Sequence, residues 1–532
     1  KFINCTSGTN GGGLDWLAGA NYGSVINCTF NNTRAARSAG AIYYDGWYGE
    51  MKNITIINTK SWGGSLNESD DKLVKYAGWD SSHWDTNTTG GDAGAIMFTG
   101  NHEYMYNVTF INCTATGRGG AVFLQANKNV TFDLCVFTNN TALGTANNTW
   151  NDDKNLSSGK NSFLSGNGGA IGFDNGATLG IIKNSRFINN TAQRMGGAIS
   201  FAKGSSNATI INSTFDNNTA KRNGGAISID GINARFDYCN FTNNAATAED
   251  IDRSVFNLHS LSQIKNVTTT NKIINETALP TAGEGTMDYL YVIVQMDGNK
   301  KVSYTMAITV KDGNKYSWSL MKNTTETGSS PVDWGTDEYF CGDGGTIFWR
   351  GDTGLVDNCR FIDNKAVWNS SYIAGGRGGA VYLQGSATDN CTNTTFSNCN
   401  FTSNIAGTNG GAIVWDTDAH YGLIEYSIFT NNTANRSGGA VYWKGTDGTI
   451  MHSTFTENSA HGNNLANDSY GSPTYGGNGG AIMWVGSDGY VYDCIFTNNG
   501  AYGHDNSGII EGGNGGAVYL QGSSDGPCNN TK

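Results

Sequence analysis

The stretch "FTNNTANRSGGAVYWKG", residues 429–445, recurs along the chain with small changes. Near copies begin at Phe187 ("FINNTAQRMGGAISFAKG"), Phe215 ("FDNNTAKRNGGAISIDG") and Phe401 ("FTSNIAGTNGGAIVWDT"). A low-complexity segment would share this composition but would not keep an aromatic residue in phase with a Gly-Gly pair. We therefore interpret the stretch as one structural unit that is stacked on itself.

Two markers define the repeat. The first is Phe followed three residues later by Asn, at Phe137, Phe187, Phe215, Phe241, Phe361, Phe401, Phe429, Phe455 and Phe496. The second is Gly-Gly-Ala followed by Ile or Val, beginning at Gly119, Gly168, Gly196, Gly224, Gly378, Gly410, Gly438, Gly479 and Gly515. The repeat spacing of Gly168, Gly196 and Gly224 is too short for a separate domain, so each unit has to pack on its neighbours.

The repeat predicts an all-β fold. Helical periodicity is absent, and "GGAIVW" alternates, with Ile413 and Trp415 on one face and Ala412 and Val414 on the other. Short strands with Gly at the corners are typical of a parallel β-helix solenoid. We expect about 13 coils, stacked at the ordinary strand spacing into a body roughly 60 Å long.

Stacking places equivalent residues in columns. The Phe column is expected to form a buried aromatic stack, and the Asn column a ladder of side-chain amides at a turn. The prediction names Phe187, Phe215, Phe429 and Phe455 for the stack, and Asn190, Asn218, Asn432 and Asn458 for the ladder. The Gly pair permits a tight corner that a Cβ would obstruct.

Phe-x-x-Asn paired with Gly-Gly-Ala-Ile/Val resembles the repeat of chlamydial polymorphic membrane proteins. It also resembles the adhesin-like surface proteins of methanogenic archaea. The resemblance covers residues 1–244 and 341–532. It implies a right-handed β-helix that is extracellular and exposed on the cell surface.

Insertions fall at one corner of the coil, between Phe-x-x-Asn and the next Gly-Gly. The minimal interval "NNTAxRxGGA" expands at 60–92, 141–167, 365–377, 461–478 and 500–514. These loops are expected to project from one edge and carry Trp62, Trp79, Trp84, Trp150 and Trp368. Exposed Trp can stack on sugar rings or anchor a partner; the alternative is that these rings fold back over the solenoid.

The largest insertion divides the chain into three parts. Residues 1–245 and 341–532 are the two portions of the predicted β-helix, and 246–340 contains no repeat marker. Within it, alternating residues joined by Asp297-Gly298 and Asp312-Gly313 turns predict three strands. We expect a small β-subdomain inserted at the edge of the solenoid.

Cysteines share one slot with serines. Two residues before Phe stand Cys28, Cys135, Cys239, Cys359, Cys399 and Cys494, or else Ser185, Ser213, Ser427 and Ser453. Such a slot favours small inward residues, hence packed free thiols. Cys239, Cys359 and Cys399 fall in successive coils, however, where stacked Cα atoms come within disulfide range, so a disulfide ladder is the alternative. Because no Cys-x-x-Cys pair occurs, we expect no zinc site.

Asn-x-Ser/Thr sequons are frequent. Candidate glycosylation sites are Asn31, Asn67, Asn87, Asn139, Asn147, Asn189, Asn217, Asn323, Asn431 and Asn467. Inward ladder asparagines cannot be modified, whereas exposed sequons can be in an extracellular setting. N-glycosylation favours an archaeal or eukaryotic surface over a chlamydial one, and since no eukaryotic family resembles the repeat, we expect an archaeal one.

One outward column is apolar. Tyr382, Tyr442 and Tyr519 follow Gly-Gly-Ala-Val, and they would form an exposed aromatic stripe if the Ile and Trp columns are interior. Such a stripe marks an interaction surface. The alternative is that inserted loops cover it.

Composition excludes several classes of function. A net charge of −12 argues against nucleic acid and against an anionic membrane surface, and no apolar run is long enough for a membrane span. The paired acids Asp70-Asp71 and Asp152-Asp153 lie in insertions, and Asp416-x-Asp418 is a weak calcium candidate. We expect no catalytic residue, metal or cofactor.

Three functions remain. The favoured one is a non-catalytic surface adhesin or cell-envelope protein, whose partners are other cells, surface glycans or copies of itself. The alternatives are a self-assembling filament or sheath subunit and a polysaccharide-active β-helix enzyme.

Overall fold

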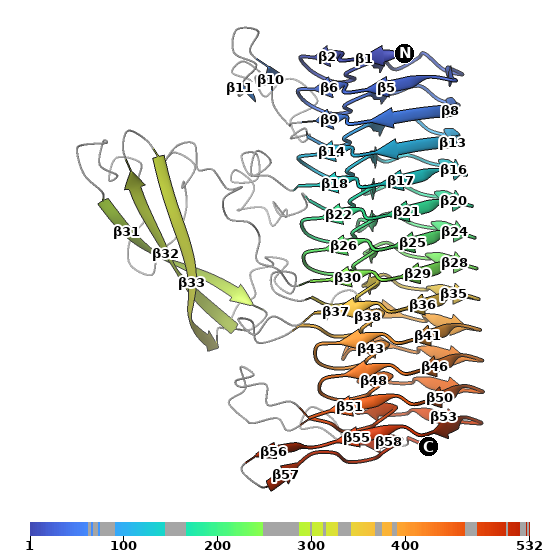
Figure 1. The fold of residues 1–532 in the computed structure, drawn as a ribbon, viewed down its shortest axis with the longest axis vertical. Coiled ribbons are helices and arrows are strands. Elements are labelled where there is room, and N and C mark those ends of the chain that lie inside the picture. Colours follow the sequence, from blue (N-terminus) through green and yellow to red (C-terminus); the bar gives the residue numbers. More distant parts are fainter. Residues whose placement is uncertain are drawn as a thin grey trace.

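The structure is a computed structural model. It describes residues 1–61, 65–66, 73–74, 91–143, 166–247, 287–297, 300–311, 315–327, 342–367, 375–385, 391–462, 476–506, 509–521, 528 and 531–532. Within these ranges every regular element is a β-strand, and most strands belong to three long parallel sheets that run side by side along the molecule (Figure 1). No helix in the described ranges is long and apolar enough to cross a membrane. The predicted all-β parallel β-helix is confirmed.

Sheet A has 23 strands in two adjacent rows. They are β1 (Phe2–Ile3), β4 (Ser24–Ile26), β5 (Thr29–Asn31), β8 (Glu50–Ile57), β13 (Tyr104–Ile111), β16 (Thr131–Asp133), β17 (Val136–Thr138), β20 (Ile181–Lys183), β21 (Arg186–Ile188), β24 (Thr209–Ile211), β25 (Thr214–Asp216), β28 (Arg235–Asp237), β29 (Asn240–Thr242), β35 (Leu355–Asp357), β36 (Arg360–Ile362), β40 (Thr395–Ser397), β41 (Asn400–Thr402), β45 (Leu423–Glu425), β46 (Ile428–Thr430), β49 (Thr449–Met451), β50 (Thr454–Thr456), β53 (Tyr490–Tyr492) and β54 (Ile495–Thr497). The strands β8 and β13 span both rows.

Sheet B has 13 short strands, one for each coil. They are β2 (Thr6–Ser7), β6 (Arg34–Ala35), β9 (Lys60–Ser61), β14 (Thr114–Ala115), β18 (Thr141–Ala142), β22 (Thr191–Ala192), β26 (Thr219–Ala220), β30 (Ala245–Ala246), β37 (Lys365–Ala366), β42 (Ile405–Ala406), β47 (Thr433–Ala434), β51 (Ser459–His461) and β55 (Gly500–Tyr502).

Sheet C also has 13 strands, formed by the residues that follow the Gly-Gly pairs. They are β3 (Leu14–Trp16), β7 (Ile42–Tyr44), β12 (Ile96–Phe98), β15 (Val122–Leu124), β19 (Ile171–Phe173), β23 (Ile199–Phe201), β27 (Ile227–Ile229), β34 (Ile347–Trp349), β38 (Val381–Leu383), β43 (Ile413–Trp415), β48 (Val441–Trp443), β52 (Ile482–Trp484) and β58 (Val518–Leu520). The expected number of coils agrees with these two sheets.

The Phe column forms the centre of the core. Phe137, Phe187, Phe215, Phe241, Phe361, Phe401, Phe429, Phe455 and Phe496 stack in one series, with neighbouring ring centroids 4.6–5.0 Å apart. The four rings named from the sequence are fully buried. Parallel pairing in register, for example Phe187 opposite Phe215, produces this stack because each coil repeats the same alternation.

The Asn column lies at the turn after the Phe strands, as predicted. Asn190 Nδ2 donates to Asn218 Oδ1 at 2.9 Å, and the same oxygen accepts the backbone N–H of Asn190 at 3.0 Å. Asn190 Nδ2 also donates to the Phe137 carbonyl at 3.0 Å. Each side chain therefore pairs buried backbone groups at a turn, where no sheet ladder can do so.

The Gly pair meets two separate steric demands. Gly196 has a φ of +66°, a conformation that favours glycine, and a Cβ on Gly197 would lie 2.0 Å from the carbonyl oxygen of Gly225 in the next coil. The first glycine thus permits the turn and the second permits the close stacking.

The solenoid continues across the largest insertion, because β29 and β36 pair in register with Phe241 opposite Phe361. Within that insertion β31 (Met287–Asp297), β32 (Lys300–Lys311) and β33 (Lys315–Thr327) form an antiparallel sheet, in agreement with the expected alternation. Three short pairs complete the described elements: β10 (Ser65–Leu66) with β11 (Leu73–Val74), β39 (Cys391–Thr392) with β44 (Ala419–His420), and β56 (His504–Asn506) with β57 (Ile509–Glu511).

Candidate functional site

The insertions share one corner of the coil, between sheet B and sheet C. In a short coil Ala434 ends β47 and Val441 begins β48. The long connections lie at the same point: between Ser61 and Ile96, between Ala142 and Ile171, and between Ala246 and Ile347, among others. This corner and the outward face of sheet C beside it are the candidate functional site.

A column of mostly polar side chains lies where the chain returns from the insertions. Five of its residues present a side-chain oxygen that accepts the backbone N–H of the equivalent residue one coil on: Asp92, Asn167, Asn223, Asp343 and Asn478. Asp92 accepts from Arg118 at 2.7 Å, Asn223 from Asp343 at 3.1 Å, and Asn478 from Asn514 at 2.9 Å. We call these equivalent residues the return column, comprising Asp92, Arg118, Asn167, Met195, Asn223, Asp343, Arg377, Asn478 and Asn514.

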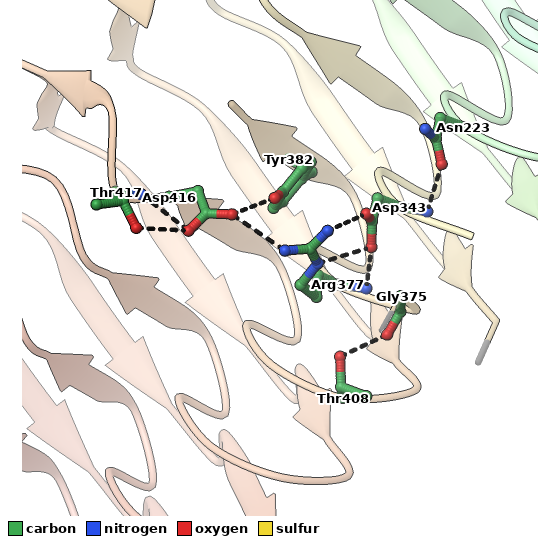
Figure 2. A network of polar contacts seen from close by, with 8 residues as sticks. All are labelled: Asn223, Asp343, Gly375, Arg377, Tyr382, Thr408, Asp416 and Thr417. Carbon is green, nitrogen blue, oxygen red and sulfur yellow. Dashed lines mark hydrogen bonds and ion pairs between the residues drawn. The ribbon is translucent and has the colours of Figure 1, made fainter. Parts of the chain in front are cut away.

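Arg377 links three successive coils at this corner (Figure 2). Its guanidinium pairs with Asp343 of the preceding coil at 2.6 Å and with Asp416 of the following coil at 3.0 Å. The guanidinium carbon lies 4.3 Å from the ring centroid of Tyr382, and the Tyr382 hydroxyl donates to Asp416. Burial alone would raise the pKa of Asp416, but Arg377, the Tyr382 hydroxyl and Lys444 together outweigh it and hold that pKa below its ordinary value.

Arg118 makes the same set of contacts. It pairs with Asp92 at 2.9 Å and with Asp174 at 3.0 Å, and it lies 4.3 Å from the ring centroid of Phe123. Each arginine therefore joins the coil before and the coil after its own. We call these two arrangements the arginine clamps.

The sequence contains a signal for the arginine clamps that the two repeat markers do not include. "GRGGAVFLQ" at 117–125 and "GRGGAVYLQ" at 376–384 differ at one position. In each case Asp stands before the Gly-Gly position of the preceding coil, and another Asp follows the sheet C strand of the next coil. Asp343 is buried, so its neutralisation by Arg377 is part of the fold as well as of the site.

The predicted aromatic stripe is wrong for Tyr382. That side chain is fully buried, packed with Phe348 and Val414 and covered by the Arg377 guanidinium. Tyr442 and Tyr519 are half-buried. The Arg377 guanidinium and the apolar neighbours along the column cover the Tyr382 ring, so this ring has no exposed surface for a partner.

The five Trp residues proposed for partner binding, Trp62, Trp79, Trp84, Trp150 and Trp368, lie outside the described residues. So do four of the candidate sequons, Asn67, Asn87, Asn147 and Asn467. The backbone of Asn323 belongs to β33.

The sequons of the repeat lie on exposed corners. Asn139, Asn189, Asn217 and Asn431 are exposed, with φ between +54° and +56°. Asparagine is one of the residues that accept this conformation. Each is followed by an inward Asn of the ladder, so one "NNT" supplies an exposed amide and a buried one. Asn31 differs, since it lies at the end of β5 and is half-buried.

The shared Ser/Cys slot faces the core. Cys239, Cys359 and Cys399 are buried free thiols, so the structure shows no disulfide ladder among them. The Cys239 N–H donates to Cys359 Sγ at 3.3 Å, just as the Ser185 N–H donates to Ser213 Oγ at 3.1 Å. The slot requires a small side chain that accepts a hydrogen bond from this backbone N–H. Serine and cysteine both meet that requirement. Burial raises the pKa of the Cys399 thiol to about 12.

The described part of the chain contains no group of three or more His, Cys, Asp or Glu side chains arranged to hold a metal ion. Asp416, one half of the weak calcium candidate, is paired with Arg377 and Tyr382 instead.

Comparison with known families finds a match to the Chlamydia polymorphic membrane protein repeat over residues 184–202, 212–230, 426–442 and 493–521. No curated protein matches the chain. A solved structure of the PL6 family alginate lyase AlyGC aligns over 92% of this chain and 86% of its own at 10% identity, with a TM-score of 0.11. That likeness carries no argument, whereas the family match coincides with the coils described above. The chain therefore contains repeats of the chlamydial polymorphic membrane protein type.

Proposed function

We propose that this protein is a non-catalytic cell-surface protein that presents its insertions from one edge of a β-helix, as an adhesin or cell-envelope component. The observation that carries the proposal is the common corner: insertions of very different length leave after sheet B and return before sheet C. The match to the polymorphic membrane protein repeat supports a surface location.

The architecture suits the display of insertions because the residues that stabilise the coils are distinct from the insertions proposed to bind partners. The stacked Phe and Asn columns stabilise each coil independently of what is inserted. Closure entropy grows slowly with loop length, so a longer insertion costs little once its ends are held. The return column holds one end, and the sheet B strand holds the other.

Recognition is proposed to lie on the insertions, through Trp62, Trp79, Trp84, Trp150 and Trp368 and the segment 246–340. The partners would be surface glycans, other cells or further copies of the chain. Tyr442 and Tyr519, half-buried on the outward face beside the corner, extend the same surface.

The test replaces insertions with the minimal connection of a natural short coil. Residues 144–166 and 368–376 would each be exchanged for Arg436 alone, the middle residue of the linker between Ala434 and Gly438, and residues 62–91 for Asn435 and Arg436. We expect a folded solenoid with unchanged strand content by circular dichroism and lost binding to cells or to a glycan array. A matched control keeps the length of each insertion but changes its Trp residues to Ser.

Retained binding by both sets of variants would leave only the segment 246–340. Retained binding after its removal as well would contradict the proposal and move recognition to the flat sheets. Lateral or end-to-end assembly of the purified protein, abolished by the same trimming, would instead support the filament alternative. Turnover of a polysaccharide by the trimmed protein would support the enzyme alternative.

A further inference from the structure

One position inside the solenoid departs from its column. Glu103 precedes β13 in a column occupied in the flanking coils by Gly23, Gly49, Val130 and Gly180, as the stacked backbone hydrogen bonds show. These positions face the core, and Glu103 is 1% exposed. A carboxyl group in place of Gly or Val in such a column is costly unless something compensates it.

Two further departures lie next to Glu103. Asn127 belongs to the column of Gly46 and Gly100, and its Nδ2 donates to the Gly100 carbonyl. Tyr44 belongs to the column formed by the last residues of the sheet C strands. The other members are Trp, Phe, Leu and Ile, so Tyr44 alone carries a hydroxyl group. The Tyr44 hydroxyl lies beside the Glu103 column, because a Cβ on Gly49, the equivalent residue of the preceding coil, would be 2.7 Å from it.

The oxygen atoms of these side chains have no hydrogen-bond partner. Both carboxyl oxygens of Glu103, Oδ1 of Asn127 and the hydroxyl of Tyr44 are buried and unpaired. A Cβ on Gly100 would lie 2.9 Å from Glu103 Oε1 and would overlap the Gly46 carbonyl oxygen, so backbone oxygen also borders the group. Three polar exceptions in successive coils thus bring unpaired oxygen atoms into the same part of the core, beside Gly46, Gly49 and Gly100.

We propose that Glu103, Asn127 and Tyr44 form an internal binding site for a small hard monovalent cation, sodium in the simplest case. Oxygen donors suit hard cations. The single carboxylate neutralises one positive charge, so a monovalent ion leaves the buried site neutral. A divalent ion would leave a net charge in the core and would require more carboxylates than the site offers.

Thermal unfolding in sodium chloride and in choline chloride at equal ionic strength tests the site. Because a ligand that binds only the folded state stabilises it, we expect the unfolding midpoint to be a few degrees higher in sodium chloride. Glu103→Gln and Asn127→Ala should each lose most of this sodium-specific difference. Asp216→Asn, which removes an exposed carboxylate from sheet A, should retain it.

A second measurement guards against a variant that fails to fold. Glu103→Val copies the residue that follows in the column, Val130, and should fold without the sodium-specific difference. In crystals of the unmodified protein grown in sodium chloride, we expect a spherical density peak between Glu103 and Asn127 that is absent from crystals grown in choline chloride. Equal midpoints in the two salts, a sodium effect that persists in Glu103→Gln, or the absence of this peak in sodium chloride would each overturn the proposal.

Discussion

Arg377 lies over the ring of Tyr382, with its guanidinium carbon 4.3 Å from the ring centroid. The two residues belong to one coil, but their charged and hydroxyl groups reach Asp343 in the coil before and Asp416 in the coil after. This contact therefore couples three coils at the corner from which the insertions leave.

Removal of the guanidinium should weaken the corner. Arg377→Met would keep much of the apolar contact with Tyr382 but leave the buried carboxylate of Asp343 unpaired, at a cost of about 3 kcal/mol in the free energy of unfolding. Chemical denaturation measures the cost. Arg360→Met removes an exposed arginine from β36 in the same part of the solenoid and should change stability by less than about 0.5 kcal/mol. Equal effects of the two substitutions would contradict the role assigned to the clamp.

Asp416 should make the protein sensitive to acid. Its pKa is lowered in the folded state, so the stabilisation is fully present above the ordinary value of 3.8 and is lost as pH falls through the lower folded pKa. Tyr382→Phe removes the hydroxyl that donates to Asp416. The loss of stability on acidification should therefore begin at higher pH in this variant. Unfolding midpoints between pH 7 and pH 2 measure the change. If the unfolding midpoint of Tyr382→Phe fell with pH just as that of the unmodified protein does, the hydroxyl would not stabilise the carboxylate.

The Phe stack should carry much of the stability of each coil. Phe215 is fully buried between Phe187 and Phe241, so Phe215→Ala should cost about 3–5 kcal/mol. Phe215→Leu keeps most of the volume and should cost less than half as much. A loss below about 1 kcal/mol in Phe215→Ala, measured by urea denaturation, would be incompatible with the packed stack.

The two asparagines of one "NNT" should differ in their effects on stability. Asn218→Ala leaves the Asn190 N–H and Nδ2 groups without their acceptor and the Phe187 carbonyl without a donor, at a cost of about 3 kcal/mol. Asn217→Gly keeps the exposed positive-φ corner and should cost less than about 1 kcal/mol. The comparison is made by thermal and chemical unfolding of the two variants. The reverse order of stabilities would mean that the inward and outward positions are misassigned.

Glycans, if attached, should be found on the outward asparagines. Asn139, Asn189, Asn217 and Asn431 are exposed at corners, and the Asn217 amide donates to Asn189 of the preceding coil at 2.7 Å, a bond that a glycan would replace. Transfer of a glycan to the amide nitrogen requires that exposure, so the half-buried sequon Asn31 in β5 should carry less glycan than these corners. Peptide mapping by mass spectrometry of native protein resolves the two classes. A native mass equal to that of the bare polypeptide would remove the inference of an N-glycosylated surface protein.

The repeat alone predicted most of the fold. The spacing of Phe, Asn and Gly-Gly was sufficient because each column makes the same contact in every coil: Phe187 on Phe215, Asn190 on Asn218, and Gly197 beneath Gly225. A contact repeated along the chain leaves a periodic pattern, and a periodic pattern can be detected in one sequence. The place of the insertions followed from the same pattern, since they interrupt one interval of it.

The tertiary structure decided what does not repeat. Tyr382 was expected on an exposed stripe, but Arg377 covers it and Asp343 and Asp416 hold that arginine in place, which only the stacking of three coils reveals. Glu103, Asn127 and Tyr44 are scattered in the sequence, and only the folded solenoid brings their unpaired oxygen atoms into the same part of the core. The sequence by itself determined the coil, its core and its open corner, because these depend on local spacing. Which side chains from different coils converge depends on the register between coils, and that register exists only once the chain is folded.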